Sequence, residues 1–159
     1  MSATLRGLSE GVAAVDPGLR RAIGSAGWGH LGMFERLAAD GVPWDISVWH
    51  VYGEDPEWAF ETLVGYGRPI WITEVSHPYG SRDGEAAQAE GLGRIMARLG
   101  ELAERYDIGA VHIYELLDEP YWAPSFEADM GLVRVGPAPG GGWQVLGPKP
   151  AYFAARPAP

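Results

Sequence analysis

The sequence contains no cysteine among its 159 residues. This absence excludes disulfide bonds, thiolate metal ligands and cysteine nucleophiles. The sequence also lacks a run of about 18 apolar residues, which a membrane-spanning helix requires. The N-terminal segment from Met1 to Arg6 does not have the apolar core of a signal peptide, so the sequence leaves localisation open.

Positive charge is scarce: 12 Lys and Arg residues stand against 21 Asp and Glu residues, which gives a net charge of -9. Phosphate backbones and anionic membrane surfaces repel such a chain, so we expect neither nucleic acid nor a membrane as a partner. Hydrophobic residues make up 47% of the chain and charged residues 21%, as in folded proteins. The length predicts one domain over residues 1–159, and prolines predict a frayed tail over residues 148–159.

Several motifs of common enzymes are missing. No GxGxxG or P-loop segment follows an expected strand, and there is no GxSxG elbow of a serine hydrolase. The four histidines show no metal-ligand spacing, so we predict no metal and no cofactor. One alternative is a small metal-dependent α/β hydrolase, which would require His50, Glu74 and His77 to meet in the fold.

Aromatic residues, by contrast, are abundant, with seven Trp, seven Tyr and four Phe. Aromatic rings can pack against flat apolar faces, and sugars have such faces. A Gly-rich, acidic and aromatic chain therefore favours a carbohydrate as the binding partner.

Hydrophobic spacing predicts alternating helices and strands. We expect helices over residues 5–15, 31–39, 56–66 and 85–106, and strands over 20–25, 44–52, 68–75 and within 107–117. A hairpin over 132–146 and a short helix over 151–155 follow, and Asp55 is the expected N-cap of the third helix. This alternation implies right-handed crossovers and a parallel sheet. The pattern leaves open a small open sheet or half of an eight-stranded barrel, because a whole barrel needs about 250 residues.

Ionisable and aromatic side chains follow the expected strands. In parallel α/β proteins, functional sites form beyond the carboxyl ends of the strands. The side chains at these positions are His50, Tyr52, Glu74, His77, Tyr114 and Glu115. Glu74 continues the apolar face of Ile70 and Ile72, where a carboxylate is costly unless it is paired or used.

Each of these residues also has a structural interpretation. Glu74 could form a salt bridge with an arginine, and His50 could be a hydrogen-bonded core histidine. Tyr52 and Tyr114 could be core tyrosines. Trp28 and Trp122, which lie in loops, could stack on a sugar or cover the core, and the segment 118–120 could simply begin the last loop.

Four segments resemble retaining glycoside hydrolases of clan A. Residues 71–74 (WITE) are similar to the seventh-strand signature, in which the Glu is the nucleophile. Residues 45–52 (DISVWHVY) resemble the sixth strand, whose His and Tyr line the catalytic cleft. Residues 111–118 (VHIYELLD) resemble the eighth strand, and residues 11–17 (GVAAVDP) the end of the fourth helix.

The resemblance implies an α/β fold that forms the C-terminal half of a TIM (β/α)8 barrel, with strands five to eight. It implies glycosidase activity on a poly- or oligosaccharide without a cofactor, with Glu74 as the nucleophile. The side chains that it implies for substrate binding are His50, Tyr52, Trp28, His77, Tyr114, Glu115 and Trp122.

One part of the clan's pattern is missing. The clan has an acid/base Glu after an Asn at the end of strand four, and no such motif precedes Leu5. Residues 118–120 (DEP) resemble it but follow the wrong strand. We therefore expect a fragment that is weakly active or inactive alone. We also expect it to self-associate through its two open sheet edges, which offer unpaired N–H and C=O groups. The inner-face side chains of four strands would lack an opposing layer; these are Ile46, Val48, Ile70, Ile72 and His112. The alternative to an enzyme is a non-catalytic carbohydrate-binding or interaction half-barrel.

Overall fold

The computed structural model describes residues 1–24 and 30–155 of the chain. These residues form two compact units. The first unit consists of Met1–His50, Pro56–Thr73 and Ala103–Val111. The second unit consists of Val51–Asp55, Glu74–Leu102 and His112–Pro159. Three of the four sheet strands therefore begin in the first unit and end in the second, whereas the first strand lies wholly in the first unit.

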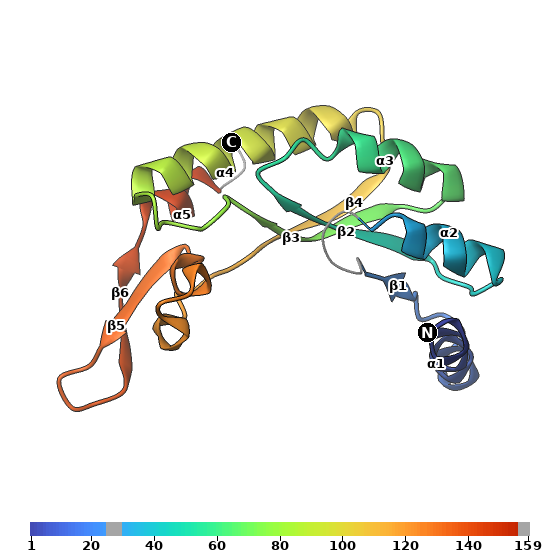
Figure 1. The fold of residues 1–159 in the computed structure, drawn as a ribbon, viewed down its shortest axis with the longest axis horizontal. Coiled ribbons are helices and arrows are strands. Elements are labelled where there is room, and N and C mark those ends of the chain that lie inside the picture. Colours follow the sequence, from blue (N-terminus) through green and yellow to red (C-terminus); the bar gives the residue numbers. More distant parts are fainter. Residues whose placement is uncertain (25–29, 156–159) are drawn as a thin grey trace. The chain divides into compact units, whose positions relative to one another are not determined.

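Within the described residues, helices and strands alternate as the hydrophobic pattern predicts (Figure 1). The elements are α1 (Ser2–Val15), β1 (Ala22–Ile23), α2 (Gly32–Ala39), β2 (Ile46–Tyr52), α3 (Glu57–Leu63), η1 (Val64–Tyr66), β3 (Ile70–Ser76), α4 (Glu85–Ala103) and β4 (Ile108–Ile113). The strands form one parallel sheet in the order β1-β2-β3-β4, with Ala22 beside Ile46. Each strand is thus paired with its neighbour in the chain, which is the order that successive right-handed crossovers produce.

An aromatic core holds the first unit together. Phe34 of α2 lies 6.2 Å from Trp44 and 6.1 Å from Tyr66, measured between ring centroids, and Trp44 lies 5.4 Å from Tyr66. Phe60 of α3 is fully buried and packs edge-on against Tyr106. Burying a large apolar side chain contributes about 1.5–3 kcal/mol, so these rings account for much of the attachment of α2 and α3.

A second cluster anchors the long helix of the second unit. Leu92 of α4 packs with Leu132 and Ala151. Gln88 of the same helix is 1% exposed, and its Nε2 donates hydrogen bonds of 3.2 Å to the carbonyl oxygens of Met130 and Gly131. Helix α4 is therefore tied to the segment that leads into the C-terminal hairpin.

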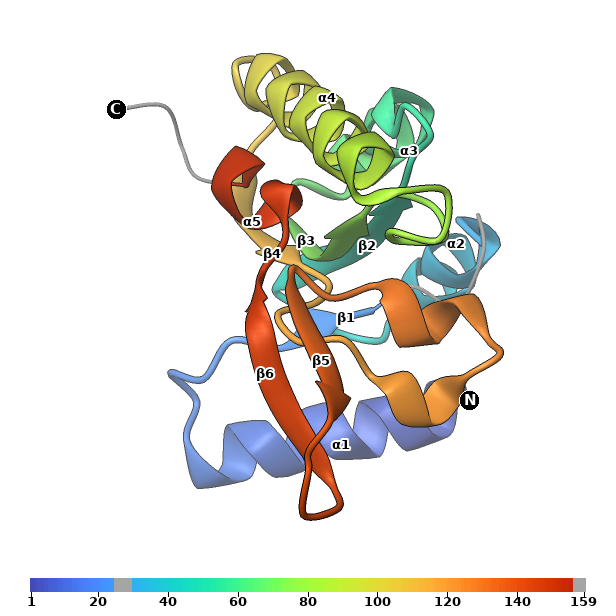
Figure 2. The same ribbon diagram turned by 90° about the vertical axis from the view of Figure 1, so that its left-hand side faces the viewer.

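The chain after β4 contains more regular structure than expected. The segment between β4 and the hairpin, which the sequence pattern leaves as a loop, holds two short 3-10 helices, η2 (Pro120–Trp122) and η3 (Phe126–Asp129). The predicted hairpin is present as β5 (Val133–Pro137) and β6 (Trp143–Pro148), which lie side by side in Figure 2.

Residues 148–155 of the tail differ from the expectation of fraying, and residues 156–159 lie outside the described residues. The short helix α5 (Pro150–Ala154) is present, Lys149 is 2% exposed and Ala151 is fully buried. The proline-flanked Lys149 and the following Ala151 are therefore held in place, because both have partners in the second unit.

Two further expectations are corrected. Asp55 does not cap α3: the N-cap residue is Pro56, and the Asp55 carboxylate instead accepts a 2.9 Å hydrogen bond from Arg98. The aliphatic side chains expected to be uncovered are buried, with exposed fractions of 4% or less for Ile46, Val48, Ile70 and Ile72. By contrast, every residue of the edge strand β4 keeps some exposure.

No helix in the described part of the chain is long and apolar enough to cross a membrane.

Candidate active site

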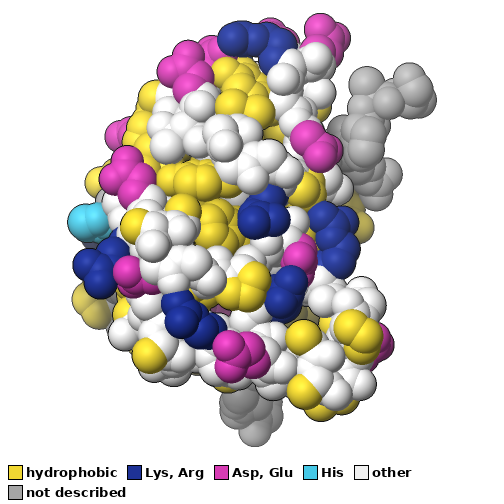
Figure 3. Space-filling model, turned by 90° about the vertical axis from the view of Figure 1, so that its right-hand side faces the viewer, with side chains coloured by type: hydrophobic (Ala, Val, Ile, Leu, Met, Phe, Trp, Pro, Cys, Tyr) yellow, Lys and Arg dark blue, Asp and Glu magenta, His cyan; other side chains and the backbone are white. Residues whose placement is uncertain are grey.

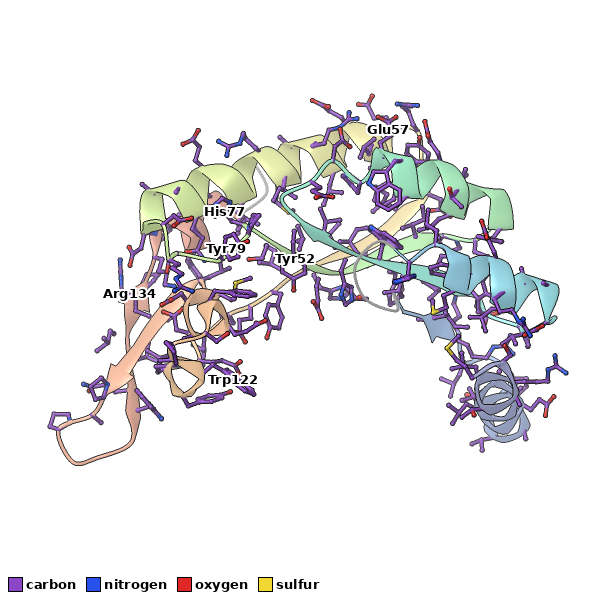
Figure 4. The ribbon with its side chains drawn as sticks, in the orientation of Figure 1. Tyr52, Glu57, His77, Tyr79, Trp122 and Arg134 are labelled. Atoms are coloured by element: carbon purple, nitrogen blue, oxygen red, sulfur yellow. The ribbon has the colours of Figure 1, made fainter. Side chains whose placement is uncertain are left out.

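A hydrogen bond between Tyr52 and Glu74 is the centre of the candidate site in the second unit. Tyr52 is the last residue of β2, and Glu74 lies near the end of β3. The Tyr52 hydroxyl donates to Glu74 Oε2 at 2.5 Å, and the Tyr52 side chain is labelled in Figure 4. Burial, followed by this hydrogen bond, raises the pKa of Tyr52 well above its usual value. The phenol therefore stays protonated and remains a donor to the carboxylate.

Tyr114 lies at the end of the neighbouring strand. Its backbone N–H donates a 3.0 Å hydrogen bond to the carbonyl of Val75, the residue after Glu74. Burial raises the pKa of Tyr114 to about 12, and the nearby carboxylates of Glu115 and Glu119 add to the shift. Tyr114 is thus a second phenol that is protonated at neutral pH.

Glu115 is the most perturbed carboxyl group of this region. Its Oε1 atom is buried and has no hydrogen-bond partner among the described residues. Burial, followed by the charges of Glu119 and Asp118, raises its pKa to about 7. Glu115 therefore keeps its proton to a higher pH than an exposed glutamate does.

Lys149 joins the loops that follow β3 and β4. Its ammonium group is 2.6 Å from Asp118 Oδ1, 2.8 Å from Ser81 Oγ and 3.2 Å from the carbonyl of Asp129. All three donors of the ammonium group are thus used. No motif in the sequence points to this residue, although Lys149 is the single lysine in the sequence and stands between two prolines.

Two exposed aromatic residues are oriented by one carboxylate. Trp122 Nε1 donates to Glu119 Oε2 at 3.0 Å, and the Tyr121 hydroxyl donates to Glu119 Oε1. The two rings are 5.7 Å apart, and the side chains are 54% and 60% exposed. Trp122, labelled in Figure 4, therefore presents a ring to solvent rather than covering the core.

The other predicted site residues have partners of their own or lie outside the described residues. The ring of His77 packs so closely against α4 that a Cβ atom at Gly91 would be 2.2 Å from its Nδ1. Burial, and then the charge of Arg94, lowers the pKa of His77. His50 belongs to the first unit and shares a 3.0 Å hydrogen bond with the Thr73 hydroxyl. Trp28 lies outside the described residues.

Tyr79 is a further exposed aromatic side chain near this region, and no motif in the sequence points to it. It is 54% exposed, has a φ of 61° and packs edge-on against Phe126 at 5.3 Å. The adjacent Gly80 leaves no room for a side chain, because a Cβ atom there would lie 2.2 Å from the carbonyl oxygen of Asp129. The loop after β3 thus packs directly against η3.

Metal chemistry has no support from the geometry. Among residues 1–24 and 30–155, no group of three or more His, Asp and Glu side chains is arranged to hold a metal ion. The described residues therefore contain no ligand group that supports the alternative of a metal-dependent hydrolase using His50, Glu74 and His77.

The fold is that of half of a TIM barrel, and three solved structures that share it are clan A glycoside hydrolases. A GH10 xylanase from Bispora sp. MEY-1, solved with xylobiose, is 15% identical, with a TM-score of 0.64 and coverage of 97% of this chain and 51% of that chain. The beta-glycosidase BGL167 is 14% identical, with a TM-score of 0.61 and coverage of 99% and 49%. An intracellular xylanase from Thermoanaerobacterium saccharolyticum, in complex with xylotetraose, is 19% identical, with a TM-score of 0.56 and coverage of 92% and 47%.

These matches confirm the predicted fold class, in which four parallel strands alternate with helices as in half of a TIM barrel. The chain spans about half the length of the solved structures that it matches. Neither a protein-family model nor a curated relative matches the sequence.

Proposed function

We propose that this chain supplies the nucleophile of a retaining glycoside hydrolase and that Glu74 is that nucleophile. The observation that carries the proposal is the 2.5 Å hydrogen bond from the Tyr52 hydroxyl to Glu74 Oε2 at the end of β3. A hydroxyl donor at this distance holds the carboxylate in one orientation. A carboxylate in a fixed orientation is what attack on an anomeric carbon requires.

In the proposed reaction, a Glu74 oxygen forms a bond to the anomeric carbon while the bond from that carbon to the leaving oxygen breaks. The product is a covalent glycosyl-enzyme, which water then hydrolyses. A retaining enzyme needs a second carboxylic acid about 5–5.5 Å from the nucleophile to protonate the leaving oxygen. Glu115 is partly protonated at neutral pH, but its Oε1 atom is enclosed, so we do not assign it this role.

We propose that the second carboxylic acid comes from polypeptide outside these 159 residues. The chain covers only 47–51% of the matched glycosidases, which leaves room for another half-barrel. The chain alone would then bind sugar and form the covalent intermediate only with a leaving group that needs no proton. Two matched structures hold xylobiose and xylotetraose, so β-linked xylo-oligosaccharides are the first substrates to test.

Tyr52, Tyr114 and Trp122 are the proposed substrate contacts in the second unit. The two phenols can donate hydrogen bonds to sugar hydroxyls, and Trp122 can stack on a sugar face. The substrate-binding roles of Trp28, His50, His77 and Glu115 stay predictions from the sequence.

A mechanism-based label tests the nucleophile independently of the missing acid. The chain is incubated with 2,4-dinitrophenyl 2-deoxy-2-fluoro-β-D-xyloside, whose leaving group departs without protonation. We expect intact-mass spectrometry to show one added fluoroxylosyl group, and peptide mapping to place it on Glu74. Glu74→Gln should remain unlabelled, whereas Glu90→Gln, a change at an exposed carboxylate of α4, should be labelled like the wild type.

Two outcomes would contradict the proposal. A label on a different carboxylate would move the nucleophile elsewhere. A folded chain that binds xylobiose but takes no label would favour the alternative of a non-catalytic carbohydrate-binding half-barrel.

A further inference from the structure

The first unit has a cavity of about 280 Å³ where the strands begin. Its lining includes Arg20 and Arg21, which precede β1, Asp45, which precedes β2, and Arg68, which precedes β3. Three of the 12 basic residues of the chain thus line one cavity, against one acidic residue. On the face shown in Figure 3, several Lys and Arg side chains lie over the middle, with Asp and Glu side chains between them.

Arg21 and Asp45 neutralise one another. Arg21 Nε donates to Asp45 Oδ2 at 2.6 Å and Arg21 Nη2 donates to Asp45 Oδ1 at 2.9 Å, which is the bidentate geometry of a strong pair. The remaining terminal nitrogen, Arg21 Nη1, donates to Ser9 Oγ at 2.8 Å. The hydrogen bonds from Arg21 lower the pKa of Asp45 to about 2. The single acid of the cavity is therefore occupied and stays ionised.

Arg20 and Arg68 have no carboxylate within ion-pair distance in the described part of the chain. The hydrogen bond of Arg20 runs from Nη2 to the backbone carbonyl of Asp45 and is long, at 3.4 Å. The nearby acid Asp16 accepts a 2.8 Å hydrogen bond from the amide of Gly18. Neither guanidinium thus forms an ion pair with a carboxylate, although the charge of Arg68 also contributes to the lowered pKa of Asp45.

Arg68 is also held in place. Its guanidinium carbon lies 4.7 Å from the ring centroid of Trp44, which is 3% exposed. Its Nε atom is buried and makes no hydrogen bond with any described residue. Stacking on an aromatic ring orients a guanidinium and reduces the entropy that it loses when it binds an oxyanion.

We propose that this cavity binds a small oxyanion of the phosphate type, which Arg20 and Arg68 hold from two sides. Planar guanidinium groups match the spacing of phosphate oxygens and bind them by charge-assisted hydrogen bonds. The lining carries three positive charges and one negative charge, in a chain whose net charge is -9, so an anion is attracted here and repelled elsewhere. This site is independent of Glu74, because its residues belong to the other unit and precede the strands.

Calorimetric titration of the whole chain with inorganic phosphate tests the proposal, with sodium chloride keeping the ionic strength constant. We expect saturable binding that chloride does not reproduce. Loss of one charge-assisted hydrogen-bonding partner should weaken the affinity about ten-fold or more, so Arg20→Gln and Arg68→Gln should both show this loss. Arg94→Gln, a change at an exposed arginine of α4, is the matched control and should bind phosphate like the wild type.

Arg20→Gln is the decisive variant, because Arg20 is exposed and its loss should not disturb the fold, whereas Arg68 also covers Trp44.

A parallel titration with a pentose phosphate identifies the source of the oxyanion. Tighter binding than that of inorganic phosphate indicates a sugar phosphate, and equal binding indicates the free ion. The proposal is overturned if phosphate produces no more heat than chloride. It is also overturned if Arg20→Gln binds phosphate as tightly as Arg94→Gln does.

Discussion

Replacing Lys149 with methionine should destabilise the second unit more than any single change at its surface. Lys149 is 2% exposed and its partner Asp118 is 11% exposed. Methionine keeps the apolar length of the side chain but removes the ammonium group, which leaves the Asp118 carboxylate without its counter-charge. Breaking a buried pair in this way costs about 3–5 kcal/mol. For a chain of this size, that loss corresponds to a fall in Tm of roughly 6–20 °C.

The assay is urea and thermal unfolding of wild type and Lys149→Met, followed by circular dichroism at several pH values. Burial raises the pKa of Asp118 even in the presence of Lys149, and loss of the ammonium group should raise it further. A protonated Asp118 tolerates burial, so the destabilisation should be largest at neutral pH and should shrink in acid. A second change, Asp118→Asn in the Lys149→Met background, should recover part of the lost stability.

Arg94→Met is the matched control, because it breaks the exposed ion pair of Arg94 with Glu90. Exposed pairs contribute about 0–1 kcal/mol, so this variant should unfold close to the wild type. A loss below about 1 kcal/mol for Lys149→Met would refute the reasoning, because it would mean that Asp118 finds water or another partner without Lys149.

Three further predictions concern the candidate site and its support. Burial raises the pKa of Glu115 to about 7, so the protonated carboxyl group contributes to the stability of the folded chain in acid, and this contribution is lost as the pH rises through 7. In unfolding measurements at several pH values, the stability of Glu115→Gln should therefore depend less on pH than that of the wild type. Tyr52→Phe removes the donor to Glu74 and should slow labelling by the fluoroxyloside at least ten-fold, and an unchanged labelling rate would exclude Tyr52 from the site. Gly91→Ala places a methyl group against His77 and should cost about 1–3 kcal/mol in urea unfolding, whereas Gly93→Ala, which has open space, should not destabilise the chain.

The order of the elements could be predicted from the sequence because helices and strands depend on local hydrophobic spacing. The apolar stripe of α4 and the apolar run of β3 identify those elements within a few residues. Local pattern was less informative for β2: the polar residue Ser47 stands between Ile46 and Val48, yet it is fully buried. Its hydroxyl accepts a 3.1 Å hydrogen bond from Trp44 Nε1, a partner that alternation cannot reveal.

Motifs at the strand ends identified Glu74 and Tyr52 as candidates, but only the tertiary structure decided which side chains meet. The bond between these two residues joins positions 22 apart in the sequence, and it depends on the parallel pairing of β2 with β3. The pattern also left an open sheet and a half-barrel equally possible, and the matches to TIM-barrel glycosidases decided between them.

The direction of a side chain beyond the end of a strand depends on the element that packs against it. His77 follows β3 just after Glu74, but Gly91 of α4 leaves a space that its ring fills. Lys149 lies 31 residues from Asp118 and 68 residues from Ser81, and it contacts both because α5 is anchored beside them. Local sequence determined the elements and their chemistry, whereas packing between distant segments determined which side chains form the site.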